Sequence, residues 1–400
     1  MSELIQRIAA KGDGVTASGR HVKGALPGDS VDAEGLITPG PHHVAPPCRH
    51  FDRCGGCQLQ HADDAALREF VTNRVVNAAR GQGLEPEALL PTHLSPPRTR
   101  RRASLQALRT QAGVLLGFRE AGSHRVIDLK QCEVLLPEMV AMLPALRRLL
   151  APHIGKGGVE VSMAACDQGI DLGLSNLALD TLEVTQALLD HAGEAGLARL
   201  SVDQGFGPET IWEPEPATIT LSGVPVPIPV GAFLQATGDA EALMVADARE
   251  WLGGTGAVVD LFAGLGTFAF GLGTRAEAGR KVLAVEADRA AHLACKAAAG
   301  RAGGSVFAMH RDLFRNPLTA GELDRFDAAL LDPPRAGARA QIAELANSKL
   351  ARIVYVSCNP SSWSRDAAVL AEAGFRLAGL RPVGQFRWST HVELVSLFTR

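Results

Sequence analysis

Short apolar runs alternate with stretches of helical spacing from about Val230 to the end of the chain. The runs are five or six residues long and rich in Val, Leu, Ile and Ala, which is typical of strands covered on both faces. Strands that alternate with helices in this way form a doubly wound, mostly parallel sheet. We therefore predict an α/β fold for residues 226–400. The expected strands are 257–262, 281–285, 327–331 and 352–357, and a helix is expected from an N-cap at Asp239 to Gly253-Gly254.

The rest of the chain divides into two further parts. Its 400 residues exceed one ordinary domain, and 46% apolar content is enough for several cores. The prolines between Pro208 and Pro229 suit neither a helix nor a central strand, so we place a boundary at 225. We predict a short β module at 1–45, which resembles the start of a TRAM domain, an RNA-binding β-barrel, and a central α+β domain at 46–225. In the central domain we expect helices at 63–80, 137–150 and 182–191 and strands between 103 and 127.

Charge is unevenly distributed along the sequence. The net charge of −3 gives the whole chain no electrostatic reason to bind a polyanion. Between Pro91 and Gln131, however, eight basic residues stand against two acidic ones, a local balance of +6. Such a block is usually a solvated face, but Arg100-Arg101-Arg102 leading into Leu105 suggests RNA-facing strands whose edge contacts phosphates.

The N-terminal residues carry no basic segment followed by an apolar one, and no stretch approaches the roughly 20 apolar residues that span a bilayer. We expect a cytoplasmic monomer with no membrane association. Seven cysteines in such a chain point to metal binding or catalysis rather than to a disulfide framework.

A glycine-rich turn follows the first strand expected in the doubly wound region. Residues 258–267 predict a buried strand, a turn with Gly264 and Gly266, and the start of a helix, while Glu286 ends the next strand. Glycines let the backbone approach a ligand, and an acid at the second strand end can accept both ribose hydroxyls. The turn alone suits NAD as well as S-adenosylmethionine, and it can also be purely structural.

The segment after the strand at 327–331 separates these cofactors. Asp332-Pro333-Pro334 places a carboxylate on a rigid turn beside the expected pocket, a feature of methyltransferases and not of dehydrogenases. Arg335 stands where amino-methylating enzymes have an aromatic residue that stacks on the target base, which excludes that class. We predict S-adenosylmethionine as the cofactor.

Cys358 follows the run 352–357, so its thiol is expected at the same sheet edge as Asp332. A cysteine at a strand end is often only a small apolar residue, but here it leads into a loop. Carbon 5 of uracil is too weakly nucleophilic to take a methyl group, so a thiolate must first add to carbon 6. The carbon 5 proton must then be removed, and Glu393, at the start of a strand, is the candidate base. The alternative for Glu393 is an exposed glutamate of an edge strand.

Four other cysteines form a three-plus-one pattern without an obvious histidine ligand. This spacing suits a [4Fe–4S] cluster better than a zinc ribbon, which usually pairs two Cys-x2-Cys knuckles. Chance spacing of reduced cysteines is the alternative, and Cys166 and Cys295 are expected to be packing residues. The candidate ligands are Cys48, Cys54, Cys57 and Cys132.

These motifs together resemble the RNA uracil-5 methyltransferase family, over nearly the whole length of the chain. The resemblance implies a class I methyltransferase domain with a Rossmann-like sheet at 226–400. It rests on the four cysteines, Gly117-Phe118-Arg119, Phe233-Leu234-Gln235, Asp260 to Gly266, Asp332 to Arg335, Ser357 to Pro360 and His391 to Glu393.

The resemblance also implies roles for individual residues. Cys358 is the nucleophile and Glu393 the general base of a transfer to carbon 5 of a uridine in RNA. Thr237 stands where the family has an asparagine, which removes one polar contact. Iron–sulfur members mostly modify the large ribosomal RNA, so 23S rRNA is favoured and tRNA is the alternative. The residues implied to line the S-adenosylmethionine site are Gln235, Phe262, Thr267, Glu286, Asp312 and Asp332.

Two readings from other classes compete with this one. An NAD-dependent oxidoreductase uses the same glycine turn, but it leaves Asp332 and Cys358 without a role. A catalytically inactive RNA-binding homologue would keep the fold without turnover.

Overall fold

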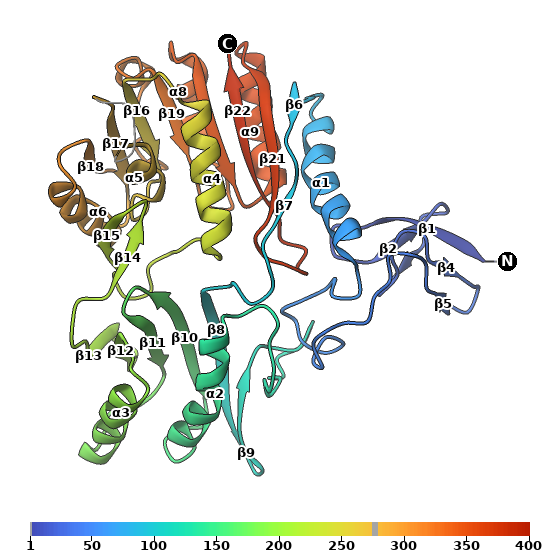
Figure 1. The fold of residues 1–400 in the computed structure, drawn as a ribbon, viewed down its shortest axis with the longest axis vertical. Helices are drawn as coiled ribbons and strands as arrows, with labels where there is room; N and C mark the ends of the chain where they lie inside the picture. The colour runs from blue at the N-terminus through green and yellow to red at the C-terminus, as the bar shows by residue number, and fades with distance from the viewer. Residues whose placement is uncertain (1, 274–278) are drawn as a thin grey trace.

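A large mixed sheet organises the C-terminal half of the chain (Figure 1). The computed structural model describes residues 2–273 and 279–400. In spatial order, the main strands of this sheet are β18 (Val306–His310), β17 (Lys281–Glu286), β16 (Ala257–Leu261), β19 (Ala328–Leu331), β20 (Arg352–Ser357), β22 (Glu393–Thr399) and β21 (Arg376–Gly384). The first five run parallel, and β22 is antiparallel to both of its neighbours. The order reverses between β16 and β19, where doubly wound sheets bind ligands at the carboxyl ends of their strands.

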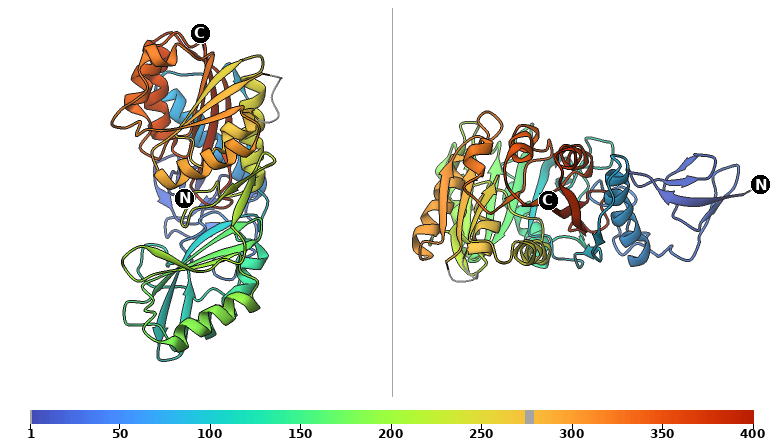
Figure 2. Two further views of the ribbon diagram at one scale, coloured as in Figure 1. Left: turned by 90° about the vertical axis from the view of Figure 1, so that its left-hand side faces the viewer. Right: turned by 90° about the horizontal axis from the view of Figure 1, so that it is seen from above.

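Helices cover both faces of this sheet, which confirms the predicted doubly wound fold (Figure 2). One face packs α8 and α9 into a core that contains Trp363 and Tyr355, and the other packs α4, α5 and α6 into a core that contains Phe270. The helices are α4 (Gly238–Trp251), α5 (Thr267–Gly273), α6 (Arg289–Arg301), α7 (Ala320–Leu323), α8 (Arg339–Asn347) and α9 (Pro360–Glu372).

The prediction of Asp239 as the N-cap of α4 is wrong. Thr237 occupies the cap position, and its hydroxyl lies 2.9 Å from that of Ser95. The carboxylate of Asp239 is instead bonded to the ring of His93 at 2.7 Å, so it is not available to cap the helix.

Segments from the region before 225 also join the large sheet. Helix α1 (Asp64–Arg80), capped by Asp63, packs its apolar residues against α9, and β6 (Ala88–Leu89) and β7 (His93–Leu94) pair with β21. The hairpin of β14 (Thr218–Leu221) and β15 (Val224–Pro227) packs into the α4–α6 core. The division into parts at 45 and 225 stays a prediction. Segments on both sides of position 225 pack in the cores of the large sheet.

A second sheet lies below the first in Figure 1. Helices α2 (Pro137–Leu150) and α3 (Leu182–Glu194) form with it a core that contains Leu146 and Leu188. The proline at 208 begins an edge strand, as its missing N–H requires. In spatial order, the strands of this second sheet are β13 (Pro208–Trp212), β12 (Arg199–Asp203), β11 (Gly169–Ser175), β10 (Val159–Cys166), β8 (Arg102–Thr110) and β9 (Gly113–Gly117).

The expected strands of the central region end earlier than predicted, at Gly117 rather than near Ile127. A Cβ at Gly117 would lie 2.2 Å from the carbonyl oxygen of Ile127, so the chain folds back tightly there. Only an isolated bridge between Arg119 and Val126 continues the pairing in this described stretch.

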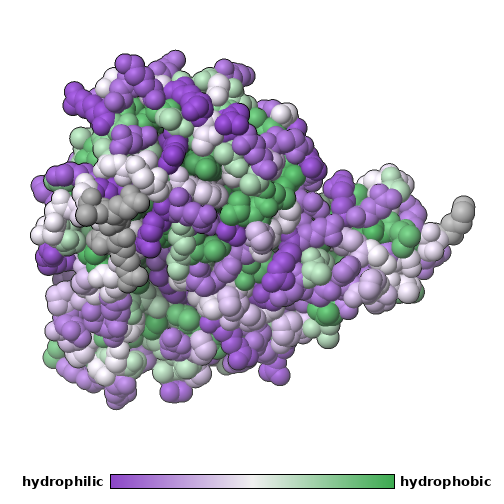
Figure 3. Space-filling view, turned by 45° about the horizontal axis from the view of Figure 1, so that its top comes forward, coloured by the Kyte–Doolittle hydropathy of each residue, from purple (hydrophilic) through white to green (hydrophobic). Residues whose placement is uncertain are grey.

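A small five-stranded sheet forms the N-terminal module, as expected for a β module. It projects from one side of the body (Figures 2 and 3). Its core is small and contains Ile5 and Val31. Over the face seen in Figure 3, polar and apolar residues are interspersed. Within the described ranges, no helix is long and apolar enough to cross a membrane. The strands are β1 (Glu3–Ile8), β2 (Gly14–Thr16), β3 (His21–Val22), β4 (Ser30–Val31) and β5 (Ile37–Thr38).

Candidate active site

The predicted nucleophile and base meet at the carboxyl edge of the large sheet. Cys358 directly follows β20, and Asp332 directly follows the neighbouring parallel strand β19. Glu393 is the first residue of β22, which runs antiparallel to β20 and pairs Leu394 with Ser357. An antiparallel strand begins where its partner ends, so the carboxylate of Glu393 and the thiol of Cys358 lie at one edge.

The three groups share one electrostatic environment. Burial, and then the charge of Glu393, raises the pKa of the Asp332 carboxyl well above its ordinary value. Burial raises the pKa of Glu393 to about 7. Burial also raises the pKa of the Cys358 thiol to about 11, and Glu393 and Asp332 add to this rise. Three acidic groups that cannot all ionise together are typical of a site that moves protons.

Two glutamines link this edge to the segment before α4. The amide of Gln235 donates to Asp332 at 2.9 Å, and the amide of Gln385 donates to the carbonyl oxygen of the Gln235 side chain at 3.1 Å. Gln385 is also hydrogen-bonded to Glu393 and accepts the backbone N–H of Ala236 at 3.0 Å. Gln235 is therefore held against Asp332.

The glycine turn lies at the same edge of the sheet. Gly264 has a φ of +54° with open space beside its Cα, and its N–H donates to Glu286 at 2.8 Å. Gly266 has a φ of +92°, and a Cβ there would lie 2.9 Å from the sulfur of Cys295. The turn needs glycine at both positions. Gly264 adopts a left-handed backbone beside open space, and Gly266 leaves no room for a Cβ atom.

The remaining predicted cofactor residues lie around this turn. Phe262 has a φ of +63°, and its ring centroid is 5.4 Å from that of Phe314. Asp312 accepts the backbone N–H of Phe314 at 2.9 Å, so one of its oxygens caps a local turn. Thr267 begins α5 and lines a hollow of 400 Å³ that also contains Glu241.

Arg102 and Phe233 border the site, and neither was predicted from the sequence as a site residue. The guanidinium of Arg102 lies 4.5 Å from the ring centroid of Phe233, and its charge acts on both Glu393 and Cys358. Phe233 is 62% exposed, which is unusual for a large apolar side chain and suits stacking against a planar ligand.

The prediction that Arg100-Arg101-Arg102 contacts phosphates stays a prediction, and each of the three guanidinium groups already contacts another residue of the protein. Arg101 is paired with Glu241 and donates to the backbone oxygen of Gln235 at 2.9 Å. Arg100 lies over the ring of Phe386, and Arg102 lies at the site just described. All three side chains are half-buried in the protein.

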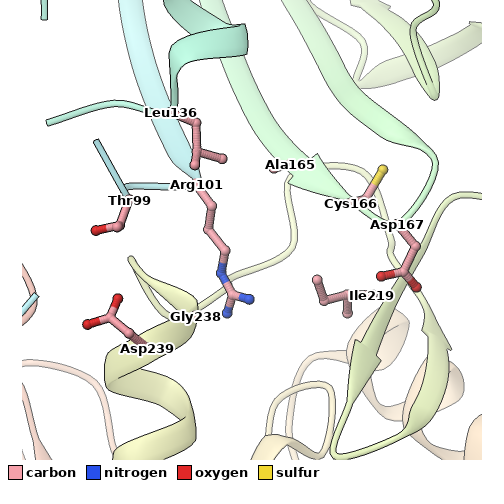
Figure 4. A pocket seen from close by; sticks show the side chains of 9 residues that line it. All are labelled: Thr99, Arg101, Leu136, Ala165, Cys166, Asp167, Ile219, Gly238 and Asp239. Atoms are coloured by element: carbon pink, nitrogen blue, oxygen red, sulfur yellow. The ribbon is translucent and has the colours of Figure 1, made fainter. Parts of the chain in front are cut away.

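An open hollow of 360 Å³ lies beside Arg101 (Figure 4). Its lining comes from the end of β10, from Ile219 of the hairpin and from the start of α4. Cys166 lies on its wall, where the thiol donates to the backbone oxygen of Gly169 at 3.3 Å. None of the predicted site residues lines this hollow.

The four patterned cysteines line a single small cavity with Arg100, Phe118 and Gln60. Burial raises the pKa of Cys57 to about 12 and also raises the pKa values of Cys54 and Cys132. Within the described ranges, no group of three or more His, Cys, Asp or Glu side chains is arranged to hold a metal ion. The cysteines thus gather in one place, without the geometry of a metal centre.

Comparison with known proteins decides the class of this site. Residues 306–400 match the family model described as tRNA (Uracil-5-)-methyltransferase. The chain is 46% identical to an uncharacterized RNA methyltransferase of Zymomonas mobilis over all of both proteins. It is 33% identical to the 23S rRNA (uracil(1939)-C(5))-methyltransferase RlmD of Pectobacterium atrosepticum, over 94% of this chain and 88% of that protein. The chain belongs to the RNA uracil-5 methyltransferase family.

A solved structure shares the fold of this methyltransferase. The Pyrococcus abyssi tRNA (uracil-54, C5)-methyltransferase in complex with S-adenosyl-L-homocysteine superimposes with a TM-score of 0.75 over all of both chains, at 21% identity. The predicted family, enzyme class and S-adenosylmethionine cofactor are confirmed, and the oxidoreductase alternative is wrong.

Some residues of the methyltransferase site carried little signal in the sequence. Gln385 lies in a loop after β21 without a motif, and Arg102 was read as part of a basic surface. Phe233 stood in the motif Phe233-Leu234-Gln235, and this motif was the signal that could have identified it.

Proposed function

We propose that the thiolate of Cys358 adds to carbon 6 of a uridine in RNA and that Glu393 removes the proton from carbon 5 after methylation. The observation that carries this proposal is the pairing of β20 with β22, which brings both side chains to one edge beside Asp332. Addition to carbon 6 makes carbon 5 nucleophilic, and loss of the proton lets the sulfur leave. The addition needs Cys358 and the proton removal needs Glu393, and both residues must reach the same uracil ring from this edge of the sheet.

The protonation states fit this order of steps. Glu393, with its pKa at about 7, is ionised in a useful fraction at neutral pH and holds a proton once it has taken one. The Cys358 thiol must lose its proton before it adds, although its surroundings raise its pKa. Cations near the thiol are therefore required, and Arg102 is one of them.

The residues around the glycine turn fit S-adenosylmethionine, which supplies an electrophilic methyl group when bound. The fit rests on the open space beside Gly264 and on the carboxylate of Glu286, fixed by two backbone N–H groups. We propose that Gln235, Phe262, Thr267, Glu286, Asp312 and Asp332 hold the cofactor.

We also propose that the cysteine cavity holds a [4Fe–4S] cluster. The donor set is four thiols and no histidine, and all four line one cavity at the meeting point of two cores. Burial raises the pKa values of Cys54, Cys57 and Cys132, and these thiols would have to lose their protons to bind iron. The cluster residues are Cys48, Cys54, Cys57 and Cys132.

We favour 23S rRNA as the substrate over tRNA, because the chain is 33% identical to the ribosomal RNA enzyme of Pectobacterium and 21% identical to the tRNA enzyme of Pyrococcus abyssi. The test is to map 5-methyluridine in total RNA from cells that lack the protein, before and after complementation. One 23S rRNA position should lose its methyl group, and wild-type protein but not Cys358→Ala should restore it. Loss of a tRNA methyl group alone would contradict the choice of substrate and leave the reaction standing.

A further inference from the structure

Arg335 and His391 form a contact that the proposed reaction does not yet use. A guanidinium nitrogen of Arg335 lies 2.9 Å from Nδ1 of His391. A guanidinium group has no hydrogen-bond acceptor atom, so Arg335 is the donor in this contact. Nδ1 of His391 accepts the hydrogen bond and must therefore carry no proton. Burial, together with the nearby charges of Arg335, Arg100 and Arg74, lowers the pKa of His391, which agrees with a neutral ring. His391 is thus an acceptor aimed at Arg335.

The backbone of Arg335 is tied to the turn that carries the nucleophile. Its carbonyl oxygen accepts the side-chain N–H of Asn359 at 2.9 Å and the hydroxyl of Ser362 at 3.0 Å. Asn359 immediately follows Cys358 and also caps α9 by accepting from Ser361. The Asp-Pro-Pro-Arg turn and the Cys358 turn therefore form one unit.

The ring of His391 is itself held in place. It meets the ring of Phe386 edge to face, with centroids 5.9 Å apart, and Arg100 covers Phe386 at 5.3 Å. Edge-to-face contact fixes the orientation of the imidazole plane. The direction of the Nδ1 lone pair, and with it the direction of the Arg335 side chain, follows from this packing.

The charges around Cys358 oppose its ionisation. Burial, Glu393 and Asp332 raise the pKa of the thiol. Arg335 acts in the other direction on both Cys358 and Glu393. Arg102 is the second cation that faces the pair. Two arginines on different elements therefore oppose the effect of the two carboxyl groups on the thiol without cancelling it.

We propose that Arg335, aimed by His391, favours the thiolate of Cys358, and that His391 is a positioning residue that acts through Arg335. The thiol proton passes to solvent, and the sulfur lone pair then forms the bond to carbon 6 of the uracil. The use of the thiolate rests on the proposed function, but the interaction itself exists in the protein without RNA or cofactor. It can therefore be tested independently.

The test is the rate at which iodoacetamide, a neutral reagent, alkylates Cys358 in the full-length protein at pH 8, measured on the peptide by mass spectrometry. Only the thiolate reacts, so the rate reports its fraction. Arg335→Gln should lower the rate about tenfold, as expected for a thiol pKa about one unit higher, and Arg335→Lys should recover part of it. Equal rates in the wild type and in Arg335→Gln would overturn the proposal.

Two controls separate charge from access to the thiol. Rising salt should slow the wild type towards the rate of Arg335→Gln, because Arg335 is exposed and salt screens its charge, and it should leave the variant unchanged. In denaturant all variants should react equally. If the difference in alkylation rate between the wild type and Arg335→Gln does not change with salt concentration, the substitution only changes the access of the reagent to the thiol. That result would also overturn the proposal.

The positioning role has a matched pair of variants. Asparagine can place an acceptor oxygen near the position of Nδ1, whereas leucine keeps the size without an acceptor. His391→Asn should stay within about twofold of the wild-type rate, and His391→Leu should fall several-fold towards Arg335→Gln. An equal fall of the alkylation rate in His391→Asn and His391→Leu would show that His391 does not position Arg335 through its acceptor nitrogen.

The results also separate this inference from the proposed function. If the wild type fails to form an adduct with 5-fluorouridine RNA while the alkylation rates differ as expected, the proposed function fails and the inference stands. If Arg335→Gln loses RNA affinity and keeps the wild-type alkylation rate, Arg335 binds a phosphate and the inference fails.

Discussion

At the scale of single residues, the proposed reaction depends on protons held by buried groups. Burial raises the pKa of Glu393 to about 7 and the pKa of Cys358 to about 11. Gln385 is hydrogen-bonded to Glu393 and also to Gln235, which donates to Asp332 at 2.9 Å. A substitution of Glu393 should therefore act on the proton-transfer step.

Glu393→Gln should separate the two halves of the reaction. The amide cannot take the carbon 5 proton, so addition and methylation proceed while release of the enzyme from RNA stops. We expect a covalent complex to accumulate on unmodified RNA, visible as a denaturation-resistant band. Turnover at the wild-type rate would remove Glu393 from the mechanism.

The release step should also depend on pH. A general base acts only when ionised, and the pKa of Glu393 at about 7 puts its protonation near neutrality. The rate of release in a single turnover should therefore rise with pH up to about 7 and level above it, falling about tenfold per unit below. A rate that stays flat between pH 6 and pH 8 would argue against Glu393 as the base.

The site residues that the sequence predicted lie mostly at strand ends. Cys358, Asp332 and Glu286 could be placed at one edge of the sheet because each ends an apolar run. Gln385 and Arg102 could not be predicted in this way, because they reach the site from distant segments through contacts that no local pattern encodes.

At the scale of elements, the alternation of apolar runs and helical stretches predicted the main strands of the large sheet. It did not predict the short strands β6 and β7 that also pair with this sheet. The four predicted strands appear within one or two residues, and α1 and α2 match their expected ranges within one residue. The two-residue strands β6 and β7 are too short for a periodic signal, and their place beside β21 depends on long-range packing.

A buried carboxylate ties three of these elements together. One oxygen of Asp366 accepts from the Tyr355 hydroxyl at 2.7 Å and from the Ala338 N–H at 2.8 Å, which joins α9 to β20 and to the start of α8. Asp366→Ala should lower the free energy of unfolding by about 2–3 kcal/mol, because it leaves both donors buried without an acceptor. Tyr355→Phe removes one bond and should cost about 1 kcal/mol.

Asp366→Asn is the matched control, since its amide oxygen can still accept both hydrogen bonds. Chemical denaturation followed by tryptophan fluorescence measures the effect, because Trp363 lies in the same core. A loss for the asparagine variant as large as that for alanine would show that the charge, not the acceptor, matters here.

At the scale of the whole molecule, the cysteine cavity lies where two cores meet. Cys132 packs against the core of the large sheet and against that of the central sheet, and Cys57 packs against the first. The sequence spacing predicted that four cysteines act together, and the structure brings them to one cavity. The spacing could not predict that this cavity would join the two sheets.

Protein purified without oxygen should contain about four iron and four sulfide ions per chain. Cys132→Ala should lose this content and become less stable, whereas Cys166→Ala should keep both, because Cys166 lies in a different hollow. Iron and acid-labile sulfide assays measure the content. Stoichiometric zinc in place of iron would contradict the assignment.

The central claim is that the sulfur of Cys358 bonds to the pyrimidine ring. Incubation with 5-fluorouridine RNA and S-adenosylmethionine tests it most directly, because fluorine blocks the loss of a proton from carbon 5. We predict a stable protein–RNA adduct that peptide mass spectrometry maps to Cys358 and that Cys358→Ala abolishes. An adduct on another residue, or methylation that persists in Cys358→Ala, would contradict the account.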